Sequence, residues 1–194
     1  MKITRLKNIE KKYFGLHDLA RALGISPESA RVAASRYVKS GFLIRLKRDL
    51  YVLADQWPYF SIEDKFRLAN LVQSPSYISL MTALSYYQIS TQMPQNFFES
   101  IALKRTKTVN VQGTVFRYQK IRPQLYFGFT KREFVFIAEP EKALLDAFYL
   151  MFRKRYTLDI ASIDFSRFNP DKIQWMVQKF PRAVQKMVAE YELV

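Results

Sequence analysis

The chain has 194 residues, no cysteine and a formal net charge of +14. Without cysteine, disulfide scaffolds and thiolate-bound zinc or iron-sulfur centres are excluded. The positive charge favours nucleic acid or another anionic surface as the partner. Because the sequence has no apolar span of about 18 residues, no secretion signal and no lipidation signal, we favour nucleic acid over a membrane and predict a cytoplasmic protein.

Positive charge is concentrated at the start of the chain, where residues 1–53 carry 12 Lys and Arg against 4 Asp and Glu. Apolar spacing there predicts two helices, Leu16 to Leu23 and Pro27 to Ser40. Gly24 suits the left-handed position that ends a helix. Ser26 followed by Pro27 is typical of an N-cap with proline in the first turn. The sequence therefore predicts a helix, a tight turn and a second helix.

The second predicted helix has two different faces. Small or aromatic residues at helical spacing predict the buried face: Ala30, Ala33, Ala34 and Tyr37. The opposite face carries polar and charged residues and one apolar residue: Glu28, Ser29, Arg31, Val32, Ser35, Arg36 and Lys39. Because Arg and Lys bind phosphates and Arg also reads guanine, we predict DNA contacts from Ser26, Ser29, Arg31, Ser35, Arg36 and Lys39. The alternative is an ordinary solvated helix face.

A basic hairpin follows this helix. The runs Phe42 to Leu46 and Leu50 to Leu53 are typical of short strands. Arg45, Lys47 and Arg48 place cations at the tip, where they can lie along a phosphate backbone or enter a minor groove. The alternative is that these cations only keep the hairpin soluble and prevent its edge from pairing with another chain. We interpret residues 1–55 as a winged helix-turn-helix DNA-binding domain.

The rest of the chain predicts an α+β fold. Residues 56–75 are predicted to be a connector helix, capped by Ser61, with Ile62, Phe66, Ala69 and Val72 facing inward. Residues 76–194 are predicted to form a mixed α+β C-terminal domain. Its expected elements, in chain order, are a break at Pro75 to Tyr77, a helix from Ser79 to Tyr86, strands at Phe98 to Leu103, Val109 to Ile121 and Phe134 to Ala138, and three helices beginning near Glu139, Ile173 and Pro181.

The first of these three helices is apolar almost all round, which predicts a buried core helix. Asp146 interrupts it, and we expect this carboxylate to pair with a cation or a backbone group rather than to catalyse. Arg153 to Arg155 follow the helix, where cations favour its dipole. Lys104, Arg105 and Lys107 are interpreted either as a second basic surface or as decoration of a turn.

An enzymatic function is not expected. His17 is the single histidine, and no metal cluster can be assembled around it. The five glycines are scattered and match neither a phosphate-binding loop nor a dinucleotide fingerprint. We therefore predict no catalytic residue, no cofactor and no metal site.

Three further blocks follow the basic N-terminal segment. They read SYISLMTALSYYQI (Ser76 to Ile89), YFGF (Tyr126 to Phe129) and IAEPEKALLDAFYL (Ile137 to Leu150). In this order they resemble the AbiEi-type antitoxin and transcriptional regulator family of type IV toxin–antitoxin, or abortive infection, systems. The resemblance spans 14–150. It departs from the family at the hairpin turn, where Asp49 stands in place of a glycine, and at Tyr87-Gln88, where the family has His-Gly.

The resemblance implies a repressor that binds double-stranded DNA at inverted repeats upstream of its own operon. A homodimer on the DNA would match such a repeat. It also implies that the second domain counteracts a nucleotidyltransferase-like toxin without a stable complex. The alternative that the residues leave open is an interaction module, in which the winged domain is a scaffold for a protein or RNA partner without operator specificity.

Overall fold

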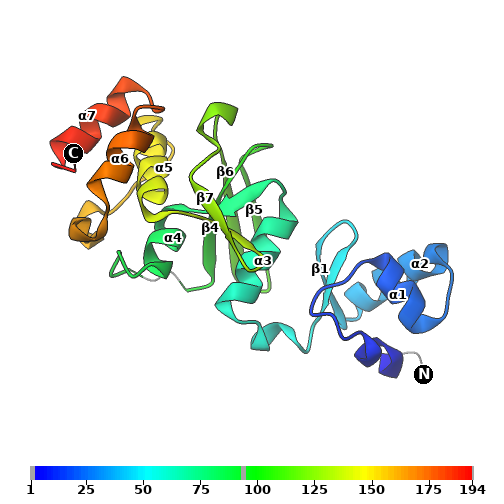
Figure 1. Cartoon of the computed structure of the whole chain (residues 1–194). Coiled ribbons are helices and arrows are strands. Elements are labelled where there is room, and N and C mark those ends of the chain that lie inside the picture. Colours follow the sequence, from blue (N-terminus) through cyan, green and yellow to red (C-terminus); the bar gives the residue numbers. More distant parts are fainter. Residues whose placement is uncertain (1–2, 93–94, 194) are drawn as a thin grey trace. The chain divides into compact units, whose positions relative to one another are not determined.

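A computed structural model describes residues 3–92 and 95–193 of the chain. The fold is a mixture of helices and strands, which confirms the predicted α+β class. The chain forms two compact units, Met1–Asp64 and Lys65–Val194, which we call unit 1 and unit 2 (Figure 1). The division falls in the first turn of a helix, within the stretch 56–75 that was predicted to be a connector.

Unit 1 consists of short helices and one hairpin. In chain order its elements are the 3-10 helix η1 (Ile3–Asn8), α1 (Leu16–Leu23), α2 (Pro27–Lys39), β1 (Leu43–Lys47), β2 (Leu50–Leu53) and η2 (Trp57–Tyr59). The bounds agree with the predicted helices and strands to within one residue. Figure 1 shows the β1–β2 hairpin beside α1 and α2.

The turn between α1 and α2 has the predicted geometry. Gly24 has φ +64° and its N–H donates to the carbonyls of Ala20 and Arg21, which ends α1. The Oγ of Ser26 accepts from the backbone N–H of Ser29 at 3.2 Å, which caps α2. These local bonds position the second helix relative to the first.

One hydrophobic core joins the helices to the hairpin. Its members include Leu19 and Leu23 of α1, Ala30 and Ala34 of α2, and Leu43, Tyr51 and Leu53 of the hairpin, all buried. Phe14 exchanges two backbone hydrogen bonds with Tyr51, at 3.0 and 2.9 Å, so the segment before α1 pairs with β2. The small alanines allow α2 to approach this core closely.

Unit 2 is built on a six-stranded mixed sheet with the order β5-β6-β4-β3-β8-β7. The strands are β3 (Ser76–Ile78), β4 (Phe97–Ala102), β5 (Lys107–Val111), β6 (Thr114–Lys120), β7 (Phe129–Arg132) and β8 (Val135–Ala138). β4 is parallel to β6 and β3 is parallel to β8, while the other neighbouring pairs are antiparallel.

Helices cover both faces of this sheet. They are α3 (Ile62–Val72), α4 (Leu80–Tyr86), α5 (Pro140–Phe152), α6 (Pro170–Val177) and α7 (Arg182–Glu190), with 3-10 helices η3 (Pro123–Leu125), η4 (Ile160–Ser162) and η5 (Phe165–Arg167). Phe66 of α3 packs against Phe98 on one face. Tyr77 donates to Asp146 of α5 on the other face. Figure 1 shows α5, α6 and α7 grouped on that second side.

Three predictions in this part of the chain are wrong, and one strand was missed. The stretch Val109 to Ile121 is not one strand, because Gln112 and Gly113 both adopt positive φ and turn it into the β5–β6 hairpin. The predicted break at Pro75 to Tyr77 is largely strand β3, which pairs on both sides. β7 was not predicted. Ile62 is 47% exposed instead of facing inward, because it lies in the first turn of α3.

Ser79 precedes α4 as predicted, but its side chain does not cap the helix. Its Oγ donates instead to Asp146 of α5 at 2.8 Å. The carboxylate of Asp146 also pairs with Lys142 and accepts from Tyr77 at 2.9 Å. Lys142 donates to the same tyrosine hydroxyl at 2.8 Å. All four side chains are buried. The pairing of Asp146 with a cation, Lys142, confirms the expectation from the sequence.

In the buried pair of Lys142 and Asp146, each charge offsets part of the effect of burial on the pKa of the other. Burial lowers the pKa of Lys142, and the adjacent carboxylate opposes that shift. Burial raises the pKa of Asp146, and Lys142 opposes it in turn. The rings of Tyr77, Phe127 and Phe180 lie between 5.3 and 5.4 Å from the Lys142 ammonium. Removing either charge alone leaves the other without compensation.

We expect Lys142→Met to destabilise unit 2 by about 3 to 5 kcal/mol, because it leaves the Asp146 carboxylate buried and unpaired. The double variant Lys142→Met/Asp146→Asn should be less destabilised than this single variant, because a neutral amide oxygen still accepts from Tyr77 and Ser79. Urea unfolding followed by far-ultraviolet circular dichroism measures both. Equal losses in the two variants would show that the uncompensated charge is not the cause.

Candidate nucleic-acid interface

The exposed face of α2 carries most of the side chains that were predicted to contact DNA. We call this face the α2 stripe: Glu28, Ser29, Arg31, Val32, Ser35, Arg36 and Lys39, all exposed. The opposite face holds Ala30 and Ala34, both fully buried. Because one face packs into the core of unit 1, the stripe is held outward by the fold itself.

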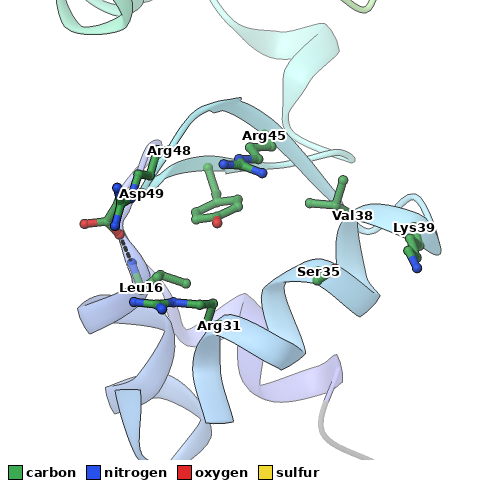
Figure 2. Close-up of a pocket in the computed structure, with 9 residues that line it drawn as sticks. Leu16, Arg31, Ser35, Val38, Lys39, Arg45, Arg48 and Asp49 are labelled. Carbon is green, nitrogen blue, oxygen red and sulfur yellow. Dashed lines mark hydrogen bonds between the residues drawn. The ribbon is translucent and has the colours of Figure 1, made fainter. Parts of the chain in front are cut away.

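An open hollow lies between α2 and the hairpin, with a volume of about 610 Å³. We call it the hairpin hollow. Its lining includes Arg31, Ser35 and Lys39 from α2 and Arg45 and Arg48 from the hairpin. In Figure 2 the hairpin arginines lie on one side of this hollow and Arg31 and Ser35 on the other. Four cations from two elements therefore border one concave surface.

A second hollow of about 460 Å³ lies on the other side of α2, next to the α1–α2 turn. We call it the turn hollow. Ser29, Val32 and Arg36 line it from the α2 stripe, and Leu23 and Ile25 line it from the end of α1 and the turn. More of the residues that line the turn hollow are apolar than of those that line the hairpin hollow, and its one cation is Arg36.

Asp49 fixes the tip of the hairpin to α1. Its φ of +57° is the left-handed conformation, which glycine adopts most readily and which Asp tolerates. Its Oδ1 accepts from the backbone N–H of Leu16 at 2.5 Å, as the dashed line in Figure 2 shows. The carboxylate therefore satisfies one of the free donors at the start of α1. A Cβ at Gly15 would lie 3.0 Å from that same oxygen, so the approach also depends on glycine there.

Four cations of the site are not engaged in ion pairs within the described part of the chain. Within residues 3–92 and 95–193, Arg31, Arg36, Lys39 and Arg48 make no ion pair. Two acids of unit 1 are engaged elsewhere, Asp18 with Lys11 at 2.7 Å and Asp64 with Lys12 at 2.6 Å.

The hydrogen bond from Lys11 holds the pKa of Asp18 below its ordinary value, although burial opposes the shift. Asp18 therefore stays ionised at neutral pH, and its charge is taken up by Lys11 and by the N–H of Gly15. Asp18 is thus paired with Lys11 and not with a cation of the α2 stripe, which carries Arg31, Arg36 and Lys39 against one acid, Glu28.

The structure places the nine predicted site residues in different ways. Five border the hairpin hollow: Arg31, Ser35, Lys39, Arg45 and Arg48. Ser29 and Arg36 border the turn hollow. Ser26 is used as the α2 cap, and Lys47 is exposed on β1 but borders neither hollow.

Other residues of the two hollows were not predicted as site residues. They include Leu16, Val38, Asp49 and Tyr51 at the hairpin hollow and Leu23, Ile25, Val32, Ala33 and Tyr37 at the turn hollow. Tyr51 is buried and reads in the sequence as an ordinary strand residue. Asp49 had a detectable signal, because it stands at the turn between two predicted strands and Asp tolerates positive φ.

Two observations concern other classes of site. Among the residues that the structure describes, no three His, Asp or Glu side chains gather closely enough to hold a metal ion. Over the same residues, no helix is both long enough and apolar enough to cross a membrane.

Substitutions at Asp49 should separate its two roles in unit 1. Asp49→Asn should stay within about 0.5 kcal/mol, because Asn accepts a hydrogen bond and tolerates positive φ. Asp49→Gly should lose about 1 kcal/mol with the cap. Asp49→Ala should lose a further ~1 to 2 kcal/mol, because it must also hold the left-handed conformation.

Tryptophan fluorescence during urea unfolding measures this series, because Trp57 of unit 1 is buried whereas Trp175 of unit 2 is already 56% exposed. If Asp49→Gly and Asp49→Ala were equally stable, backbone conformation would not contribute, and the explanation of this turn would fail.

Comparisons with known proteins bear on the fold alone. No family model matches the chain, and no curated protein sequence matches it. Among solved structures, the chain is similar to the crystal structure of the RV2827C protein from Mycobacterium tuberculosis. That match has a TM-score of 0.61 at 10% sequence identity and covers 94% of this chain and 71% of the other. At this identity the similarity describes the arrangement of elements and not an activity.

Proposed function

We propose that the protein is a sequence-specific DNA-binding transcriptional repressor of the antitoxin type, whose unit 1 is a winged helix-turn-helix domain. The observation that carries the proposal is the hairpin hollow, where cations of α2 and of the hairpin border one open surface. In this proposal α2 enters the major groove as the recognition helix, and the β1–β2 hairpin is the wing.

The order and joints of the elements support this assignment. A short helix, a tight turn at a left-handed glycine, a capped second helix and an antiparallel hairpin follow one another in unit 1. The second helix presents its polar and basic face to solvent. Such an outward face suits readout of base edges, while hairpin cations suit phosphate contacts.

The charges of the hairpin hollow support a polyanionic partner. Arg31, Lys39, Arg45 and Arg48 border it from both sides without an ion-pair partner among the described residues. DNA carries a phosphate about every 3.4 Å along each strand, so one strand can meet several of these cations together. The proposal therefore assigns this hollow chiefly to the phosphate backbone.

Assignment to an antitoxin rests on the resemblance to the AbiEi-type family. Its blocks from Ser76 to Ile89 and from Ile137 to Leu150 contain the residues that form the buried Lys142 and Asp146 cluster. We infer that the protein represses its own toxin–antitoxin operon, as a dimer on inverted repeats, and that unit 2 counteracts a nucleotidyltransferase-like toxin.

Binding to the DNA upstream of its own gene should be specific and strongly dependent on salt. If each dimer neutralises six or more phosphates, the affinity should fall roughly a thousandfold between about 50 and 200 mM salt. Fluorescence anisotropy with the upstream duplex and with a shuffled duplex of equal composition measures both properties. No preference for the upstream duplex would contradict the regulator and would favour a scaffold for a protein or RNA partner.

Substitutions in the α2 stripe should distinguish base readers from phosphate anchors. Arg36→Ala should weaken operator binding by about 1 to 3 kcal/mol and leave binding to shuffled DNA nearly unchanged, because it removes an arginine that can read a guanine. Lys39→Ala at the hairpin hollow should weaken both duplexes equally. Lys186→Ala, an exposed cation of α7, is the matched control. Equal losses for Arg36→Ala on both duplexes would make it a phosphate anchor.

A further inference from the structure

Val32 is an apolar side chain in the middle of a polar and charged helix face. It is 53% exposed, although α2 is held in place by Ala30 and Ala34 on its opposite side. Ser29 precedes it by three residues and Arg36 follows it by four, so both are its neighbours on the helix surface. Val32 also lines the turn hollow.

Neither helix propensity nor the core of unit 1 accounts for a valine at this position. A β-branched residue is a weaker helix former than Ala, Glu or Lys at an exposed helical position. The core of unit 1 is closed by other residues, and Val32 is not among those packed against it. An exposed apolar group at the centre of a proposed interface is therefore better explained by what it meets in the complex.

The major groove of DNA offers one prominent apolar group, the C5-methyl of thymine. The other groups at base edges there are hydrogen-bond donors and acceptors, which an aliphatic side chain cannot satisfy. A valine that entered the groove against those groups alone would desolvate them without compensation. The chemistry of Val32 therefore matches a thymine and opposes a cytosine in the same place.

We propose that Val32 determines specificity by packing against the C5-methyl of a thymine in each operator half-site. The proposal rests on the proposed function, because it takes α2 as the recognition helix. Arg36 lies four residues farther along α2, about 6 Å at 1.5 Å per residue. Base pairs are spaced about 3.4 Å apart. The guanine that Arg36 reads is consequently one or two base pairs from this thymine.

The two sides of α2 then have different roles. The hairpin hollow, bordered by Arg31, Lys39, Arg45 and Arg48, holds the phosphate backbone. The turn hollow, with Val32 beside Ser29 and Arg36, reads the bases. This division makes the sequence preference depend mainly on three residues of α2.

The test replaces each thymine of the operator duplex, one at a time, with deoxyuridine, which lacks only the methyl group. Anisotropy titrations of the full-length protein compare wild type, Val32→Ala and Lys39→Ala on every duplex. At one position in each half-site, deoxyuridine should weaken wild-type binding about fourfold, the effect of one buried methyl group. Val32→Ala should bind the unmodified operator correspondingly less tightly and show little further loss at that position.

Lys39→Ala is the control, because it should bind all duplexes less tightly while keeping the full loss at that thymine. Val32 is exposed, and Ala favours helix, so the variant is expected to fold. If wild type prefers the operator but Val32→Ala keeps the same deoxyuridine losses at every position, the inference about Val32 is wrong and the proposed function stands. If wild type shows no operator preference, the proposed function itself fails.

Discussion

The arrangement of the candidate interface depends on one contact between the hairpin tip and the first helix. Asp49 holds a left-handed turn and accepts a hydrogen bond from the N–H of Leu16. Since α1 is itself joined to α2 by the Gly24 turn, this contact sets the position of Arg48 relative to Arg31. A glycine in the turn would give the same backbone and no such anchor. The carboxylate at this position thus has a structural consequence that glycine would not have.

Unit 2 is organised by a different kind of constraint. Lys142 and Asp146 are both buried on α5, and Tyr77 and Ser79 bring β3 and the start of α4 to the same carboxylate. A buried ion pair is weak evidence for high stability, because desolvation opposes the attraction between the charges. It does restrict which strand can lie beneath α5, because another arrangement would leave the pair without its hydroxyl partners. We therefore interpret the cluster as a determinant of register more than of stability.

Local signals predicted unit 1 well, because its joints are encoded by neighbouring residues. Gly24 and Ser26 specify the turn at short range, so the bounds of α1 and α2 could be read directly. Unit 2 was harder to predict. Ser76 to Ile78 is strand only because β4 and β8 lie on its two sides, and sequence periodicity does not contain such distant partners. The division of the site into two hollows likewise required the path of the hairpin.

The same distinction explains why the cations were recognised as a group while Val32 was not. Charge is long-ranged, so a cluster of Lys and Arg indicates an anionic partner before any geometry is known. A single valine on a helix becomes informative only once its exposure is measured against a closed core. Phosphate contacts supply affinity without sequence information, whereas discrimination depends on a few groups that meet base edges. The least conspicuous residue of the α2 stripe, Val32, is for this reason assigned to specificity together with Ser29 and Arg36.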